Sequence, residues 1–169
     1  MTSFASLRSL IVGTVVLASA CSSNMMDADL ATQLRSVSPR GGATAIAVSA
    51  DMVLTFDRPM MAGMEQYLVL HRGAVTGPTI PMGCNWSDSQ KALTCRPSQP
   101  LASATRYVIH MGGGMLDGDG QGIGMEGSGM GMGGQWATSA MMAGQTGMMG
   151  SGWVHANGSY GMVFEFTTQ

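Results

Sequence analysis

The sequence has few charged residues, and those it has form no cluster. Asp, Glu, Lys and Arg make up 11% of the 169 residues, well below the roughly 25% of an average protein. The eight Lys and Arg residues are scattered along the chain, whereas nucleic-acid-binding domains gather basic side chains on one face. The composition therefore argues against nucleic acid as a partner.

Sequence motifs of the common enzyme classes are also missing. There is no Gly-x-Ser-x-Gly nucleophile turn, no His-Glu-x-x-His zinc helix and no phosphate-binding loop. The glycines at 112–114 are followed by Met115, where a phosphate-binding loop would need Lys and then Ser or Thr. We therefore expect a protein that is not an enzyme.

The apolar run near the N-terminus, residues 10–17 (LIVGTVVL), is shorter than the ~20 residues that a transmembrane helix needs. It follows Arg8 and leads through small residues to Cys21. This arrangement resembles a bacterial lipoprotein signal, in which the first Cys is lipidated and becomes the mature N-terminus. We expect residues 1–21 to be such a signal, with Cys21 as the lipid anchor in the membrane. The alternative is an ordinary secretory signal cleaved near Ala20, which would leave Cys21 unmodified.

The other two of the three cysteines are consistent with export. Cys84 and Cys95 flank a polar turn at residues 87–91, and a turn centred there places Cys84 opposite Cys95 and Trp86 opposite Leu93. Directly opposed residues of antiparallel strands have Cα atoms ~4.5–5.5 Å apart, which is within disulfide range. An oxidising compartment then predicts a disulfide. The alternative, a metal-binding thiol pair, lacks a nearby His or further Cys.

Strand patterns dominate the rest of the chain. Residues 22–36 are polar and show no alternation, so we interpret them as a tether. Strand and turn patterns begin at residue 37. The alternation of apolar and polar residues is clearest at 52–56, 107–111 and 162–167, which predicts half-buried antiparallel strands. Short strands separated by turns indicate one all-β sandwich over residues 37–169. The predicted core is Met52, Leu54, Phe56, Leu101, Tyr107, Ile109, Phe164 and Phe166. His110 and His71 fall outside it, and we expect both to be solvated.

Five segments resemble a known family. They are residues 37–44 (VSPRGGAT), 52–60 (MVLTFDRPM), 100–107 (PLASATRY), 116–120 (LDGDG) and 164–168 (FEFTT). In this order they are similar to the SbsA-type bacterial Ig-like domains, and the resemblance implies an immunoglobulin-like antiparallel β-sandwich. In that family the Asp-Gly turn leads within a few residues to the last strand, whereas here an insertion at about 120–160 intervenes.

The insertion is rich in Gly and Met. Its candidate metal ligands are Met125, Met130, Met132, Met141, Met142, Met148, Met149 and His155. Ordering a Gly-rich backbone costs much entropy, and few side chains are available to bury the methionines. We therefore expect a long flexible loop with most of its thioethers near the surface. Soft sulfur donors favour Cu(I), and by extension Ag(I), over hard cations. The alternative is a low-complexity loop, either disordered or folded over a sheet with Met as filler.

Two smaller patterns suggest other ligands. Met61 and Met64 could extend a metal site, while Met60 matches the Pro-Met position of the family. Residues 117–122 (DGDGQG) resemble the start of a calcium loop, but Ser128 stands where an EF-hand needs Glu. The family turn accounts better for these residues than calcium does.

Two function classes follow. The first is a lipoprotein of the cell envelope, facing the periplasm or the exterior, that binds Cu(I) or Ag(I) through the insertion. The second is a structural or interaction module of the envelope, in which the sandwich contacts another protein and has no metal role. Fold alone does not decide between them, because Ig-like domains host many functions.

Overall fold

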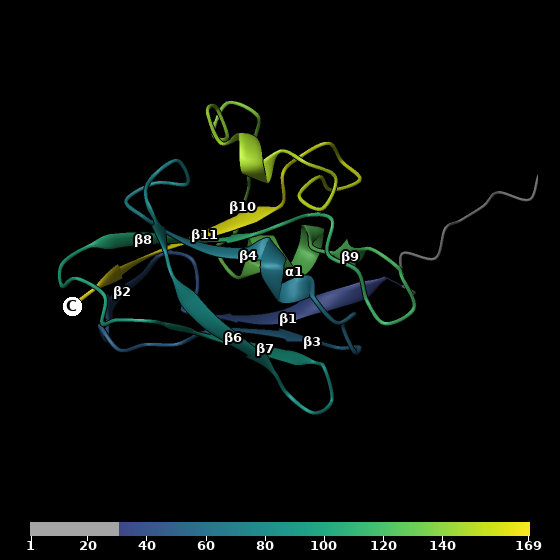
Figure 1. The fold of residues 1–169 in the computed structure, drawn as a ribbon, viewed down its shortest axis with the longest axis horizontal. Helices are drawn as coiled ribbons and strands as arrows, with labels where there is room; N and C mark the ends of the chain where they lie inside the picture. The colour runs from purple at the N-terminus through teal and green to yellow at the C-terminus, as the bar shows by residue number, and fades with distance from the viewer. Residues whose placement is uncertain (1–30) are drawn as a thin grey trace, which may run out of the picture.

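A computed structural model describes residues 31–169 of the chain, and the predicted signal with Cys21 lies outside the described residues. Two β-sheets pack face to face (Figure 1). The first, here the β3 sheet, contains β1 (Thr32–Ser38), β3 (Met52–Phe56), β6 (Met82–Trp86), β7 (Ala92–Pro97) and β9 (Ile123–Gly124) in the order β6-β7-β3-β1-β9. This confirms the predicted all-β, Ig-like sandwich.

The second sheet, here the β8 sheet, has the order β10-β11-β8-β4-β5. Its strands are β4 (Leu68–Arg72), β5 (Thr79–Ile80), β8 (Arg106–Met111), β10 (Gln135–Trp136) and β11 (Met162–Thr168), and β2 (Ala43–Ile46) pairs in parallel with β11. A short 3-10 helix, η1 (Met64–Tyr67), precedes β4. No helix in residues 31–169 is long and apolar enough to cross a membrane.

The core lies between the sheets and agrees with the sequence. All eight predicted core residues are at most 5% exposed, so the alternation identified the inward face of the strands that it predicted. Tyr107 packs against Phe166 with ring centroids 5.7 Å apart, and its hydroxyl oxygen accepts a 2.9 Å hydrogen bond from the backbone N–H of Ala102. This contact forms a tyrosine corner, as in other immunoglobulin-like sandwiches.

Strand β1 begins at Thr32, before the predicted start of the domain at residue 37. The register with β3 shifts between Leu34 and Ser36. Because this bulge inserts a residue, Leu34 and Val37 both face the core although three positions separate them. The bulge hides the period-2 pattern, so the sequence alone assigns residues 32–36 to the tether.

The disulfide and its register are as predicted. Cys84 is bonded to Cys95, with Cα atoms 4.0 Å apart, and β6 pairs with β7 so that Trp86 lies opposite Leu93. Cys95 is fully buried in the core. The bond therefore ties the edge strand β6 to its inner neighbour β7.

Replacing both Cys84 and Cys95 with Ala is expected to lower the free energy of unfolding by about 3 kcal/mol, since the bond closes a short loop in the unfolded chain. Urea denaturation measures the change. Reduction of the unmodified protein should destabilise it by a similar amount. Equal stability of the variant and the oxidised protein would contradict the prediction.

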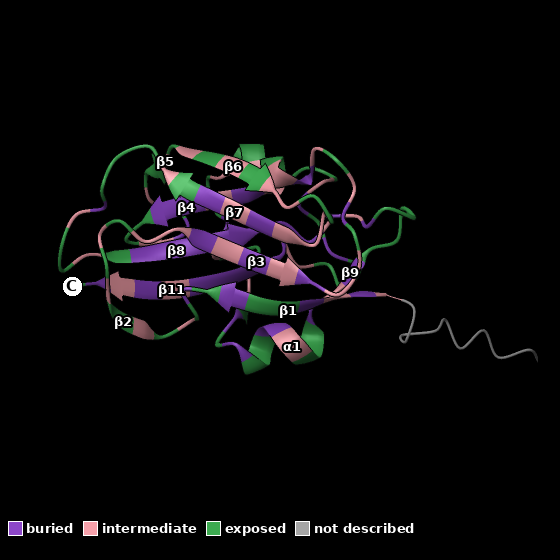
Figure 2. Cartoon of the chain, turned by 90° about the horizontal axis from the view of Figure 1, so that it is seen from below, coloured by how far each residue is buried: buried purple, intermediate pink, exposed green. Residues whose placement is uncertain are grey.

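The insertion is folded, which corrects the expectation of a flexible loop. It contains β9, α1 (Glu126–Gly131), β10 and a 3-10 turn, η2 (Thr146–Met148). Its first part runs along the edge of the sandwich beside β1 and β11, where α1 lies (Figure 2). Its later part forms a third layer over the outer face of the β8 sheet (Figure 1). We call residues 135–161 the cover.

Glycine makes this compact arrangement possible. An added Cβ at Gly134 would meet the side chains of Met162 and Phe164 at 2.5–2.6 Å, and one at Gly114 would meet the backbone of Ser151 and Gly152 at 2.7–2.8 Å. The missing side chains let the insertion approach the sandwich closely. Met125, Met132 and Met142 are therefore buried against the sheets instead of in a core of their own.

Candidate functional site

The structure does not bring the seven candidate methionines together. Met125 and Met132 belong to the main core, and Met142 lies in a second cluster with Val75, Val108, Ala137 and Val163. These three thioethers are at most 9% exposed, so the expectation that most would lie near the surface is wrong for them. Met141 and Met148 pack half-buried against the second cluster, and only Met130 and Met149 are exposed. The burial follows from glycine contacts that the sequence pattern did not reveal.

His155, the eighth candidate, is also mostly buried. Its ring packs on Trp136 with centroids 4.8 Å apart, and its Nδ1 accepts a 3.2 Å hydrogen bond from the backbone N–H of Asn157. Nε2 lies 3.8 Å from a carboxylate oxygen of Glu126. These contacts hold the turn that leads the cover back to β11.

His71 and His110 are fully buried, which corrects the expectation that both are solvated. Neither ring faces the main core, as predicted for His110. The preceding residues on the two strands, Leu70 and Ile109, face it instead. The two histidines lie on the outer face of adjacent strands, and the cover closes over that face. The indole of Trp153 packs on His110 with ring centroids 4.8 Å apart.

The two histidines are diagonal neighbours across the β4–β8 pair. His71 pairs with Val108, and His110 pairs with Val69 on one side and Val163 on the other. The imidazole centroids are 6.0 Å apart, with the ring planes inclined by 37°. The two imidazoles are thus close neighbours on the outer face of the β8 sheet.

Each histidine uses one ring nitrogen and leaves the other without a partner. His71 Nδ1 lies 3.2 Å from the carbonyl oxygen of Gly77, and His110 Nε2 lies 2.7 Å from that of Tyr160. Because a carbonyl only accepts, these nitrogens carry the hydrogens and donate. In a neutral imidazole the remaining nitrogen, His71 Nε2 or His110 Nδ1, then holds a lone pair, and both are buried with no hydrogen-bond partner.

Burial keeps both rings neutral. It lowers the pKa of His71, against the hydrogen bond to Gly77. It lowers the pKa of His110 to about 4, against the hydrogen bond to Tyr160 and with some help from His71. Near neutral pH the pair therefore presents two uncharged acceptors inside an apolar layer.

Acidification is expected to destabilise the metal-free protein. The unfolded chain protonates His110 below its ordinary pKa of 6.5, but the folded protein does so only near 4. The unfolded state thus binds more protons in this window, so stability is complete above pH 6.5 and falls as the pH approaches 4. His110 alone accounts for about 3 kcal/mol, and His71 adds in the same direction.

Chemical denaturation with a chelator present, at pH 7 and pH 4.5, measures this loss. In the variant His110→Phe the dependence on pH should become much weaker. Equal stability of the unmodified protein at both pH values would show that the rings are accessible to solvent in the folded state.

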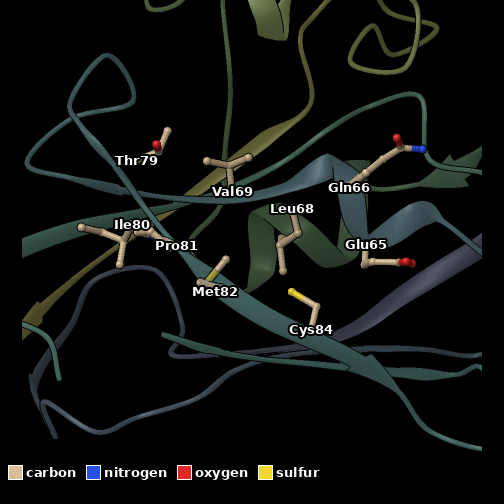
Figure 3. A pocket seen from close by; sticks show the side chains of 9 residues that line it. All are labelled: Glu65, Gln66, Leu68, Val69, Thr79, Ile80, Pro81, Met82 and Cys84. Carbon is tan, nitrogen blue, oxygen red and sulfur yellow. The ribbon is translucent and has the colours of Figure 1, made fainter. Parts of the chain in front are cut away.

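An open groove of about 450 Å³ lies between η1 with β4 and the crossing from β5 to β6 (Figure 3). Its walls are mainly apolar, with Leu68, Ile80 and Met82 among them. Cys84 is in the disulfide, and the carboxylate of Glu65 accepts a 2.8 Å hydrogen bond from the indole N–H of Trp86, which lowers its pKa. The lining thus holds no free thiol, and its one carboxylate is already engaged.

The turn at Asp117 has a structural role, because the carboxylate is fully engaged in hydrogen bonds within the domain. Asp117 is buried, and its carboxylate accepts hydrogen bonds from Thr32 Oγ1 and from the backbone N–H groups of Asp119 and Gln121. Burial would raise its pKa, but these hydrogen bonds, with the charge of Arg58, lower it below the ordinary value. Within residues 31–169, no group of three or more His, Cys, Asp or Glu side chains is placed to hold a metal ion.

Residues 28–128 match the family described as Bacterial Ig-like domain. This match covers more than half of the chain and agrees with the observed sandwich. The chain belongs to this family. The matched residues thus include the sandwich as far as α1, while the cover and β11 lie beyond them. Comparison with curated proteins gives no match.

Solved structures give remote likenesses. The N-terminal part of the S-layer protein SbsC is 19% identical, with 57% of this chain and 22% of that chain covered and a TM-score of 0.42. L,D-transpeptidase 1 of Mycobacterium tuberculosis is 20% identical, with 47% and 35% covered and a TM-score of 0.38. An L,D-transpeptidase of Mycobacterium smegmatis is 16% identical, with 50% and 37% covered and a TM-score of 0.40. The chain thus matches well under half of each of these proteins.

Proposed function

We propose that this chain is a non-catalytic module of the bacterial cell envelope, tethered to a membrane through a lipid on Cys21. The observation that carries the proposal is an Ig-like sandwich whose first strand begins at Thr32, close in sequence to that cysteine. Such a spacing would keep the domain near the membrane surface. Several acyl chains would anchor it firmly, because each buried CH₂ contributes ~0.8 kcal/mol.

The domain would act by contact with another envelope component. The groove of Figure 3, which lies beside the disulfide, has mainly apolar walls and no free thiol. The histidines lie beneath the cover, out of reach of a large substrate. These features support a structural or interaction role over catalysis.

Anchoring is tested by expressing the full chain in a bacterium with a labelled fatty acid. The protein should carry the label and stay in the membrane fraction after washing with high salt. Cys21→Ser should lose the label and become soluble, while a matched variant lacking Cys84 and Cys95 should keep the label. An unlabelled, soluble parent protein would contradict lipid anchoring.

Soft-metal binding by surface thioethers is the alternative to this structural or interaction role, and the fold leaves fewer residues for it. Met130 and Met149 are 50% and 37% exposed, and Met141 and Met148 are half-buried. An ion held by these four would need the cover to rearrange, since Met130 lies on α1 and the others lie in the cover.

A further inference from the structure

The His71–His110 pair has an arrangement that is unusual for histidines that merely fill space. Buried polar atoms without a partner are rare in folded proteins, and each costs about 1–3 kcal/mol. Here two such atoms, His71 Nε2 and His110 Nδ1, belong to rings whose centroids are 6.0 Å apart. The two rings are close enough for one small ligand to contact both imidazoles.

The hydrogen bonds of the two rings are those of metal-binding histidines. A histidine that binds a metal through one nitrogen usually donates the other N–H to a backbone carbonyl or a carboxylate, which fixes its tautomer and orientation. His71 and His110 each donate to a backbone carbonyl and keep the opposite nitrogen free. Since both rings are neutral, an ion would displace no proton from them.

The side chains around the His71–His110 pair indicate which kind of metal ion would bind there. The cover contributes Met142, which is fully buried and packs in one cluster with Val108 and Val163, the direct cross-strand neighbours of His71 and His110. Carboxylates near the cover are engaged or exposed: Glu165 pairs with Arg106, and Glu126 is largely exposed. Imidazole with thioether, and without carboxylate or thiolate, suits a soft monovalent ion.

We propose that His71 Nε2 and His110 Nδ1 bind one Cu(I) ion, with the thioether of Met142 as a further donor from the cover. The proposal does not depend on lipid anchoring or on an envelope partner. It shares only Met142 with the set of ligands predicted from the insertion. The ion would enter when the cover opens, and its binding would hold the cover closed.

Competition with a Cu(I) chelator tests the proposal. Full-length protein in detergent, with the Cys84–Cys95 disulfide intact and oxygen excluded, should bind one Cu(I) per chain. His71→Phe and His110→Phe should each weaken binding by about 100-fold or more, since loss of groups outside the ligand shell already costs roughly 10–100-fold. Met142→Leu should weaken it less, and the matched surface variants Met130→Leu and Met149→Leu should leave it unchanged.

A second measurement uses the unmodified protein, so its result does not depend on whether the variants fold. Ag(I) is added to protein labelled with ¹⁵N in its histidines, and scalar coupling between silver and the nitrogens His71 Nε2 and His110 Nδ1 is expected. The proposal is overturned if neither ion binds, which would leave ordered water as the partner of the two nitrogens. It is equally overturned if binding survives both His variants, or if it is lost on replacing Met130 and Met149.

Discussion

Gly161→Ala is expected to lower the free energy of unfolding by about 4 kcal/mol or more, an exceptional loss for a single methyl group. Gly161 has φ +90°, where an L side chain is strained. An added Cβ would overlap the carbonyl oxygen of Met111 and lie 2.6 Å from the backbone nitrogen of Gly113. Neither atom can yield easily, because Met111 belongs to β8 in the middle of the sheet.

The same substitution should also loosen the cover. The carbonyl of Gly161 accepts a 2.8 Å hydrogen bond from Ala137 N–H, and Tyr160 N–H donates to the carbonyl of Ala137. Thermal and urea denaturation measure the loss. Gly147→Ala is the matched control, since no atom lies within 4 Å of a Cβ added there, and it should change stability by no more than about 0.5 kcal/mol. Equal effects of the two variants would contradict the close packing of the cover.

Excision of residues 121–159, with a short turn in their place, is expected to leave a chain that does not fold as a soluble monomer. The cut removes Ile123, Met125 and Met132 from the main core. Full burial of such side chains contributes ~1.5–3 kcal/mol each, and domains are stable by only about 5–15 kcal/mol in total. The cut also exposes Val108 and Val163 on the outer face of the sheet.

Circular dichroism and size-exclusion chromatography of the excised protein test this expectation. Met125→Ala alone should cost about 3 kcal/mol, as large-to-small changes in cores do. Met130→Ala, at an exposed position of α1, is its control and should be close to neutral. A well-folded, monomeric excised protein would show that the insertion adds nothing to the sandwich.

Alternation was a sound guide wherever a strand has one face in the main core. It identified the strands around Leu54, Ile109 and Phe164, and the register that places Cys84 opposite Cys95. It failed at β1, where the bulge after Leu34 moves Val37 onto the same face. A bulge changes the period locally, so the strand loses its signature in the sequence.

The second buried face could not be predicted, because its signal is divided between distant segments. Val108 and His110 on β8, and Val163 on β11, occupy outward positions that a two-layer sandwich leaves in water. They are buried only because Ala137, Met142 and Trp153 return over them from the insertion. A hint was present in the sequence: Val163 is an apolar residue at an outward position of the last strand.

The same cause explains which functional candidates were missed. His71 and His110 look like surface histidines in the sequence, because nothing near them in the chain indicates a cover. The many methionines favoured a metal site within the insertion, because its Gly-rich composition implied that their thioethers are exposed. Close approach of glycine backbone to the sheet reverses that inference, since it lets thioethers such as those of Met125 and Met142 reach existing apolar surfaces.

Amide hydrogen exchange tests most directly whether the insertion is a folded layer over the β8 sheet. The decisive amides are those of Gly113, Ala137 and Tyr160, which donate to Trp153, Gly161 and Ala137 respectively at 2.8–2.9 Å. We predict that all three are protected, with opening free energies approaching those of the β8 amides. Exchange at the rate of an unstructured chain would contradict the layer, and with it the buried environment of His71 and His110.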